Sequence, residues 1–577
     1  MPTRPRISHL PLCLVLAGIV ALGCAPDPPQ ATDGRPPLLP EGAEKAAQTI
    51  HRSALELVLR TLSDDVMEGR GPGSVGDERS RAYLSAVLRE GGLEPGGPSQ
   101  SWLQPFEIVG ISGEVPLAWS FTAPDRSGST SLEFKQDFVA VAGAQRDEVG
   151  LDRAELVFVG YGIQAPEYRW DDYKGADLRG KVLVMLNNDP DWDPELFAGE
   201  TRLYYGRWTY KYESAAAQGA AGAILIHTDD SAGYPWQVVQ TSWTGEQFEL
   251  PHQGEPRLEV RSWVTEAAAR KLMSLAGLDL AELVQGAQSR DFRPVSLGVT
   301  TSLHLHSKLR STSTANVIGI VPGRDPLLRN EAVIYTAHHD HLGIGAADST
   351  GDTIYNGARD NATGVALVVA VAKAFKALPK PPRRSIVVAL VGAEEQGLLG
   401  SQYYAQHPTI APGRIAANIN VDGANVLGRA TDLGFIGYGK SDLDAVVESV
   451  AAWQGRTVKG DEFPDRGYFY RSDQFNFSKI GVPAFYLKPG ITYIGRPAEW
   501  GREQAELYTR ENYHQASDEF DESWNYDGMV EDARLAFYCG LMIAEADALP
   551  AWKPGDEFEA ARKAALAALQ GSAESSD

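Results

Sequence analysis

The chain has 577 residues, too many for a single ordinary hydrophobic core, and its 43% apolar and 22% charged residues are typical of a globular protein. The net charge of −23 argues against a nucleic-acid partner, which would require a basic surface. We therefore expect at least two domains and no nucleic-acid partner.

The first 23 residues have the pattern of an export signal. Arg4 and Arg6 precede an apolar run, residues 10–23, which is too short to span a bilayer as a mature helix. The run ends in Ala-Leu-Gly before Cys24 and resembles the cleavage site of bacterial lipoproteins, with an ordinary secretory signal as the alternative. We expect an exported protein that is anchored by a lipid on Cys24 to the bacterial cell envelope, on the periplasmic or cell-surface side. If the signal is instead an ordinary secretory one, we expect a secreted protein. No other membrane contact is expected.

Cysteine use argues against disulfides. Cys13 would leave with the signal, and Cys539 lies in an apolar helical pattern that is typical of a small buried residue. We expect neither a disulfide framework nor a cysteine-based metal site. Any metal would then have to be held by histidines and carboxylates.

The pattern of apolar residues divides the chain into six segments. They are the signal (1–23), a Pro-rich tether (24–43), an N-terminal part of the main domain (44–131), an insert (132–300), the main domain (301–550) and a helical tail (551–577). Before the insert the pattern predicts helices over 44–62 and 77–90 and a strand over 102–109. Within the insert, short strands alternate with aromatic, Gly-rich loops, and no stretch has clustered metal ligands.

After residue 316, predicted strands alternate with predicted helices. The strands cover 332–336, 385–391, 417–421, 433–436 and 484–487, and the helices cover 364–377, 396–406, 442–452 and 529–546. This alternation indicates an α/β fold with a doubly wound, mostly parallel sheet flanked by helices, to which the β-rich insert is added.

Polar side chains follow these strands, where parallel strands bring their carboxyl ends together. The candidates for a shared site are His338, Asp340, Asp360, Glu394, Glu395, Asp422 and His514. Neighbouring side chains on extended backbone point in opposite directions, so one of Glu394 and Glu395 can bind a metal while the other reaches a water molecule. A bridging carboxylate holds two divalent ions roughly 3.5–4 Å apart. Asp518 could be no more than a loop or capping acid.

Five motifs occur in order along the main domain. They are Ala337-His-His-Asp-His-Leu-Gly343, Asp360-Asn-Ala-Thr-Gly364, Gly392-Ala-Glu-Glu-Gln-Gly397, Asn420-Val-Asp-Gly423 and Tyr513-His514. Together they resemble the two-zinc exopeptidase family that includes bacterial leucyl-type aminopeptidases and glutamate carboxypeptidase II. Glu68-Gly-Arg-Gly71 resembles the lead-in of that family, and residues 132–300 resemble the protease-associated domain that many of its members carry.

The resemblance implies a role for each motif residue. His338 and Asp422 would hold one Zn²⁺, Glu395 and His514 would hold the other, and Asp360 would bridge the two ions. Glu394 would be the general base, Asp340 would orient the ring of His338, and Tyr513 would donate to the oxyanion. Arg471 and Asp473 stand where the family places substrate-pocket residues, although Gln474 replaces the histidine that commonly follows. His339 would point away from the metals, and His341 would lie beside the ligands or in a loop.

The expected function is that of a two-zinc aminopeptidase, which removes N-terminal residues from peptides with a metal-activated water and a Glu general base. A carboxypeptidase or dipeptidase of the glutamate carboxypeptidase type is the alternative. A glutaminyl cyclase or a receptor-like relative fits the intact set of ligands less well. Side-chain specificity, set by loops 460–470 and 490–508, is not readable. The sequence also leaves open the role of the insert and the oligomeric state. It does not fix the identity of the metal, because manganese or cobalt could occupy the same ligands as zinc.

Overall fold

The computed structural model describes residues 39–125, 128–194 and 196–574. The predicted export signal, the Cys24 anchor and most of the predicted tether lie outside these residues. Within the described part of the chain, no helix combines the length and the apolarity needed to cross a bilayer.

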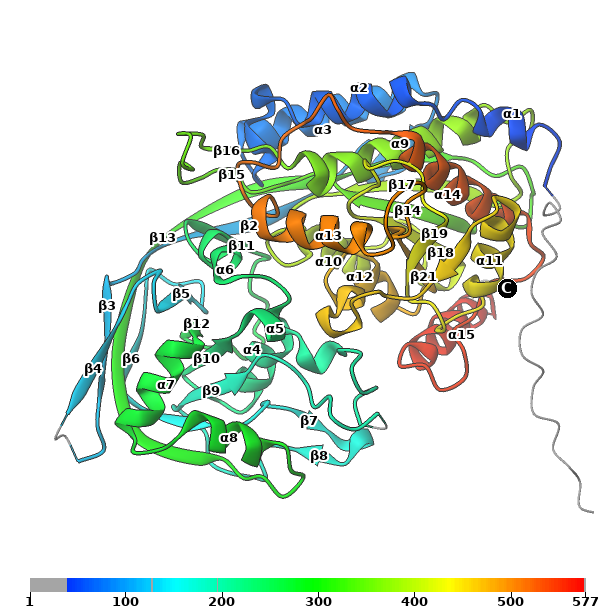
Figure 1. The fold of residues 1–577 in the computed structure, drawn as a ribbon. Coiled ribbons are helices and arrows are strands. Elements are labelled where there is room, and N and C mark those ends of the chain that lie inside the picture. Colours follow the sequence, from blue (N-terminus) through cyan, green and yellow to red (C-terminus); the bar gives the residue numbers. More distant parts are fainter. Residues whose placement is uncertain (1–38, 126–127, 195, 575–577) are drawn as a thin grey trace, which may run out of the picture.

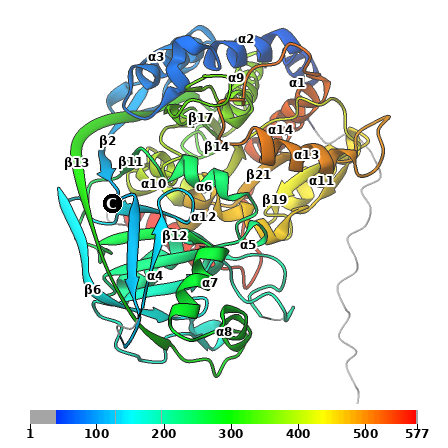
Figure 2. The same ribbon diagram turned by 60° about the vertical axis from the view of Figure 1, so that its left-hand side comes forward.

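Two bodies of secondary structure share one long strand (Figures 1 and 2). Strand β13 (Val295–Val321) pairs antiparallel with β6 (Glu148–Phe158) along its first half and with β17 (Ser385–Val391) at its end. Between these two regions it pairs with β2 (Leu103–Glu114). We call the body that contains β17, residues 43–95 and 315–574, the main body. The body that contains β6, residues 118–305, is the second body.

Four parallel strands form the centre of the sheet in the main body. In spatial order they are β17, β14 (Ala332–His338), β18 (Ile415–Val421) and β21 (Ala484–Pro489). Every residue of β14, β17 and β18 is buried, as expected for parallel strands that are covered on both faces. At the far edge, β19 (Asp432–Ile436) pairs antiparallel with β21 and parallel with β20 (Thr457–Lys459).

Helices cover both faces of this sheet. One face packs against a cluster that contains α1 (Ala43–Ala47), α2 (Arg52–Leu62), α3 (Val75–Glu90), α9 (Thr363–Lys376), α11 (Leu443–Trp453) and α14 (Asp527–Glu545). The other face packs against α10 (Leu399–Gln406) and α12 (Gln474–Lys479), through Tyr404 and Phe477. The predicted α/β fold with a mostly parallel sheet and flanking helices is thereby confirmed.

The N-terminal helical segment differs from its prediction. Instead of one helix over 44–62, the chain forms α1 and α2, separated at residues 48–51. His51 has an extended backbone (φ −145°, ψ 162°), and its ring accepts the Ala54 N–H to cap α2. A histidine at the N-cap therefore interrupts a pattern that reads as continuous.

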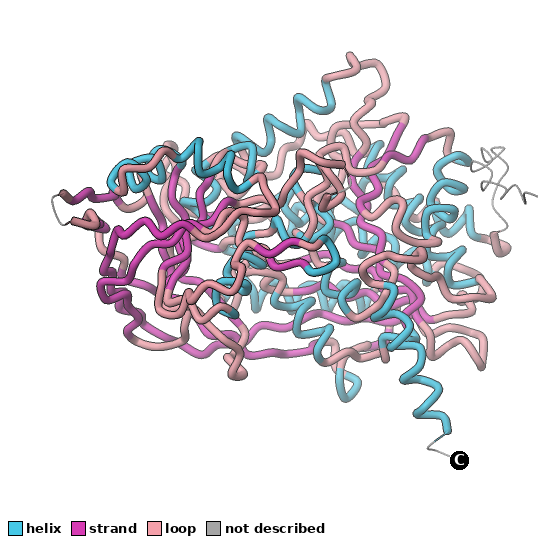
Figure 3. Tube along the Cα trace, turned by 90° about the horizontal axis from the view of Figure 1, so that it is seen from below, coloured by secondary structure: helices cyan, strands magenta, loops and turns pink. Residues whose placement is uncertain are grey.

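The second body has its own core. The pairing that begins at β6 continues in spatial order through β9 (Val182–Leu186), β10 (Gly222–His227), β12 (Val260–Thr265) and β5 (Phe138–Ala142). Around these strands lie the helices α4 (Trp208–Ala217), α7 (Glu266–Leu275) and α8 (Leu280–Ala287). Figure 3 shows these strands gathered at one end of the molecule, away from the C-terminal helix α15 (Glu559–Glu574). The core includes Trp119 and Phe121 of β3 (Ala118–Thr122), which precede the predicted insert boundary at residue 132. The likeness to a protease-associated domain stays a prediction.

Candidate metal centre

The carboxyl ends of three neighbouring strands carry predicted site residues. His338 is the last residue of β14, and Asp422 directly follows β18. Glu394 and Glu395 come three and four residues after the end of β17. Because the three strands are parallel and adjacent, these side chains meet at one edge of the sheet.

Two loops bring the remaining predicted ligands to the same edge. Asp360 lies in the turn 358–362, which leads into α9. His514 lies between α13 (Trp500–Glu511) and α14, where its backbone has a positive φ of 58°. Asp360 and His514 are each only 7% exposed, so the site is closed from these two sides as well.

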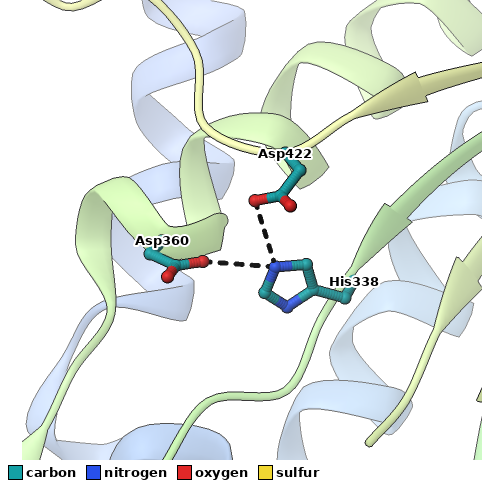
Figure 4. A group of neighbouring side chains, drawn as sticks. All are labelled: His338, Asp360 and Asp422. Carbon is teal, nitrogen blue, oxygen red and sulfur yellow. Dashed lines mark hydrogen bonds and ion pairs between the residues drawn. The ribbon is translucent and has the colours of Figure 1, made fainter. Parts of the chain in front are cut away.

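One group of side chains gathers around His338 (Figure 4). Its Nε2 atom lies 3.2 Å from Asp360 Oδ1 and 3.4 Å from Asp422 Oδ1. The three residues come from a strand end, a pre-helical turn and a second strand end, and they offer donor atoms within 4.8 Å of one another. One imidazole and two carboxylates at such distances form a candidate site for a divalent metal.

A second group shares Asp360 with the first. His514 Nε2 lies 2.8 Å from Glu395 Oε2 and 3.5 Å from Asp360 Oδ2, yet it has no hydrogen-bond partner of good geometry among the residues that the structure describes. Asp360 thus directs one carboxylate oxygen at His338 and the other at His514. The other oxygen of Glu395 lies 2.7 Å from His341 Nδ1. His341 therefore contacts the predicted ligand Glu395, which fits the first of the two places predicted for it, beside the ligands or in a loop.

The charges of this site call for a cation. Burial lowers the pKa of His338, but the charge of Glu394 and the contacts with Asp360 and Asp422 raise it more, to well above its usual value. Burial and Glu395 oppose each other in the same way at His514, where the pKa rises to about 10. The surrounding carboxylates thus favour positive charge at both imidazoles. Divalent ions would balance the same charge, and imidazole and carboxylate are the zinc ligands available without cysteine, so these residues fit a metal centre.

Asp340 has a different main partner from the predicted one. Its carboxylate lies 3.8 Å from His338 Nδ1, whereas its backbone carbonyl oxygen is closer, at 3.3 Å. The carboxylate instead accepts the backbone N–H groups of Glu394 (3.0 Å) and Glu395 (3.3 Å). Asp340 therefore fixes the turn that carries both glutamates, and its burial raises its own pKa to about 7.

Asp518 supports the site in a way that the sequence did not reveal. The buried carboxylate accepts the N–H groups of Arg359 at 3.1 Å and Asp360 at 3.0 Å, and the hydroxyl of Tyr508 at 3.0 Å. These bonds hold the backbone on which Asp360 stands. An acid in a loop 158 residues further along the chain carries no local signal of that role.

Arg70, in the segment that resembles the family's lead-in, was also missed. Its fully buried guanidinium donates to the backbone carbonyl oxygens of Leu62, His339, Asn356 and Gly357. Burial lowers its pKa to about 10, while the nearby acids, Asp340 first, act in the opposite direction. Arg70 thus ties the segment after β14 to the turn before Asp360.

Glu394 and Tyr513, the predicted general base and oxyanion donor, lie next to the predicted metal ligands. Glu394 Oε2 is 3.9 Å from His338 Nε2, and burial raises the pKa of Glu394 well above its usual value, with Glu395 and Asp422 adding to the effect. Tyr513 stacks on His514 with ring centres 3.9 Å apart.

Asp473 is fully buried in the same region, and Arg471 is half-buried there. The guanidinium of Arg471 lies 5.1 and 5.2 Å from the ring centres of Tyr234 and Tyr468, and its charge interacts with the hydroxyl of Tyr513. Neither carboxylate oxygen of Asp473 has a hydrogen-bond partner among the described residues, and burial raises its pKa to about 7.

A large cavity opens from the site into the main body. Asp360, Glu394, Asp422 and Tyr513 line its inner end. The loops 460–470 and 490–508, which were expected to shape specificity, line much of the rest with aromatic and charged groups. The loop residues include Asp461, Phe463, Tyr468, Tyr493 and Tyr508. Lys459 at the end of β20 and Lys488 in β21 also line the cavity.

A smaller cavity lies on the other side of Glu394, between the two bodies. From the main body it is lined by Glu394, Glu395, Arg471, Tyr513 and His514. From the second body it is lined by Arg207, Trp208, Tyr234, Val238, Ser242 and Trp243, among others. Glu394 and Tyr513 line both cavities, so they stand where the two meet.

An α/β sheet with buried imidazole and carboxylate groups at its carboxyl edge is an arrangement that suits a metal-dependent hydrolase. Residues 316–538 match the sequence profile of peptidase family M28. The match covers the main sheet from the end of β13 to α14 and includes every predicted metal ligand.

Several known proteins are similar to the chain. The leupeptin-inactivating enzyme 1 of Streptomyces exfoliatus is 27% identical over 225 residues, which cover 38% of this chain and 46% of that enzyme. Aminopeptidase NAALADL1 of Mus musculus is 30% identical over 260 residues, 36% of this chain and 32% of that protein. The chain thus spans 46% of the length of the first relative and 32% of the second. An aminopeptidase of Pseudomonas aeruginosa (strain UCBPP-PA14) is 25% identical over 466 residues, 76% of this chain and 69% of that protein.

The fold also has a solved counterpart. The structure of the aminopeptidase from Aneurinibacillus sp. strain AM-1 superposes with a TM-score of 0.51 at 17% sequence identity. The alignment covers 88% of this chain and 97% of that one, so the likeness extends over both bodies.

Proposed function

We propose that the chain is an aminopeptidase that holds two Zn²⁺ ions and hydrolyses the N-terminal peptide bond of its substrates. The observation that carries the proposal is the position of Asp360, whose two carboxylate oxygens face two different imidazoles. A carboxylate placed in this way suits a bridge between two metals. His338 and Asp422 would complete one site, and Glu395 and His514 the other.

The side chains around the metals would transfer protons and stabilise charge during hydrolysis. When bound, the ions would polarise the peptide carbonyl and lower the pKa of a water molecule. Glu394 would take a proton from that water and pass it to the leaving amine, a task that suits a buried carboxyl with a raised pKa. Tyr513, whose hydroxyl lies near the charge of Arg471, would donate a hydrogen bond to the developing oxyanion.

The two cavities give the substrate a direction. The N-terminal residue would occupy the large cavity, where Phe463, Tyr468 and Tyr493 favour an apolar side chain. The rest of the peptide would leave through the smaller cavity between the bodies. As part of the same proposal, the protein is exported and anchored to the cell envelope by a lipid on Cys24.

A substrate assay tests the direction of cleavage. The purified protein, with and without added Zn²⁺, would be given aminoacyl-p-nitroanilides and N-acetylated dipeptides. The proposal predicts zinc-dependent release of nitroaniline. Cleavage of the blocked dipeptides alone would contradict it.

One observation favours the carboxypeptidase or dipeptidase alternative. Arg207 and Arg471 both line the cavity between the bodies, and neither forms an ion pair with a carboxylate among the described residues. The Nε atom of Arg207 is buried without a hydrogen-bond partner. Two such guanidinium groups would suit the carboxylate of a short leaving group.

Matched substrates separate the two functions. If the arginines bind a terminal carboxylate, Leu-Leu should be cleaved with a far lower KM than Leu-Leu-amide, and Arg207→Gln should remove the difference. Equal KM values for the acid and the amide would leave the aminopeptidase as the better account.

A further inference from the structure

The second body reaches into the metal centre of the main body. Helix α6 (Trp236–Ser242) belongs to the second body, and its last residue, Ser242, places its hydroxyl oxygen 2.9 Å from Nδ1 of His514. His514 is separated from Ser242 by 272 residues and is a candidate metal ligand of the main body.

The ring of His514 is held on three sides. Its Nε2 atom faces Glu395 and Asp360, one face stacks on Tyr513, and Nδ1 meets Ser242. If Nε2 offers its lone pair to a metal, Nδ1 carries the hydrogen and donates it to Ser242 Oγ. The hydroxyl of Ser242 would thereby select the tautomer that can bind metal.

The two candidate metal sites differ in where this support comes from. The Nδ1 atom of His338 faces the carbonyl oxygen of Asp340, two residues away in the same loop. The Nδ1 atom of His514 instead faces a residue of another body. Only the His514 site therefore depends on how the two bodies are docked.

Other contacts keep α6 in place over His514. On the same helix, Gln237 donates from Nε2 to Oε1 of Gln515 at 3.0 Å, so the helix holds two consecutive residues of the loop. Elsewhere along the junction, the ring of Tyr204 packs on Phe475 at 4.9 Å, and the Arg202 N–H donates to the Pro464 carbonyl oxygen at 3.0 Å.

We propose that Ser242 is a positioning residue for His514, through which the second body controls retention of the metal ion bound by His514 and Glu395. This inference rests on the proposed two-metal site. It gives the second body a role in the metal centre: when α6 is docked the His514 site binds its ion tightly, and when α6 is displaced that ion is held weakly while the His338 site is unaffected.

The test is a chelator titration of the full chain loaded with Zn²⁺, followed by elemental analysis of the ions that remain. We expect Ser242→Ala to lose one of its two ions at a chelator concentration about 10–100-fold lower than the parent, and to keep the other ion as the parent does. Ser242→Thr, which keeps the hydroxyl, should restore retention. At saturating Zn²⁺, kcat should recover, because the substitution weakens retention of the ion and leaves the ligands in place.

Thr241→Ala is the matched control. Thr241 precedes Ser242 on α6, and within the described part of the chain its hydroxyl bonds only to the carbonyl oxygens of Gln237 and Val238 of the same helix. It should retain both ions as the parent does. Equal unfolding temperatures of the metal-free parent and metal-free Ser242→Ala would show that the substitution acts on metal retention and not on the fold. If Ser242→Ala fails to fold, Ser242→Cys provides the same comparison.

Two outcomes overturn the inference separately. If the parent holds two ions and Ser242→Ala releases each of them at the same chelator concentration as the parent, Ser242 has no positioning role, although the proposed function stands. If the parent never holds two ions, the proposed two-metal site fails and the inference fails with it.

Discussion

Replacing Asp518 by Asn tests how the bridging position of Asp360 is held. The buried carboxylate accepts two backbone N–H groups on its two oxygens, from Arg359 on Oδ1 and Asp360 on Oδ2, and Oδ2 also accepts the Tyr508 hydroxyl. Asn has nearly the same shape but only one oxygen. Whichever way the amide turns, one backbone N–H then faces an NH₂ group and loses its acceptor.

The expected cost follows from that lost bond. A hydrogen bond to a charged group contributes about 1.5–3 kcal/mol, and leaving a buried donor unpaired costs about 1–3 kcal/mol. These ranges describe overlapping parts of the same loss, so we expect Asp518→Asn to lower the free energy of unfolding by about 2–3 kcal/mol. Because the displaced backbone carries Asp360, we also expect weaker binding of at least one ion.

The assay is urea unfolding of the metal-free chain, with chelator titration of the loaded chain beside it. Glu519→Gln is the matched control, since it removes the same charge from the next residue. Glu519 is less buried, and its Oε1 atom accepts from Asn356 Nδ2, a bond that Gln can keep. The control should change the unfolding free energy by less than about 0.5 kcal/mol. If Asp518→Asn behaved like the control in both assays, the reasoning about Asp360 would be refuted.

Three further predictions concern other parts of the main body. Burial raises the pKa of Asp461, in the large cavity, to about 6, so its ionisation lowers stability as the pH rises from about 4, near the unfolded-state pKa, to about 6. Asp461→Asn can still accept the Phe463 N–H and should raise the unfolding free energy in urea by up to about 3 kcal/mol at pH 7.5 and leave it nearly unchanged at pH 3; equal effects at the two pH values would contradict the assignment. Gly364→Ala would place a methyl group 2.1 Å from Asn361 Oδ1 and 2.6 Å from the Val421 carbonyl oxygen, and it should lower the free energy of unfolding by about 3 kcal/mol or more, as measured by thermal unfolding. Gly286→Ala, in open space on α8, is the control and should be neutral or stabilising by up to about 1 kcal/mol; similar values for the two would show that the contact at Gly364 relaxes freely. Asp360→Asn should leave at most one tightly held Zn²⁺ per chain by elemental analysis, and retention of two would show that Asp360 does not bridge.

The alternation of strands and helices in the main body was readable because its strands are short apolar runs between clear helical patterns. Helix ends were less readable. The helix predicted from residue 396 begins at Leu399, because the carbonyl oxygen of Glu394 accepts the N–H groups of Gly397 and Leu398 in a turn, and Leu398 has a positive φ of 64°. The break at His51 has the same character, since a side-chain cap decides it and the apolar pattern does not.

The candidate site divides in a similar way. His338, Asp360, Glu394 and Asp422 stand in local motifs next to strand ends or a helix start, and the structure brings them together, while their catalytic and metal-binding roles stay predictions. Asp518, Arg70 and Ser242 act through the backbone or through another side chain far away in the sequence. Their contacts follow from how the loops and the two bodies pack, so no spacing in the chain indicates them.

The most direct test of the central claim is the Zn²⁺ content of purified Glu394→Gln beside that of the parent chain. Both should hold two ions per chain after reconstitution, because Glu394 is assigned to proton transfer. Turnover of an aminoacyl-p-nitroanilide should fall by at least about 10²–10⁴-fold in the variant, the range for loss of a general base. A parent chain with one ion or none would contradict the two-metal site, and loss of an ion in Glu394→Gln would mean that the roles of Glu394 and Glu395 are reversed.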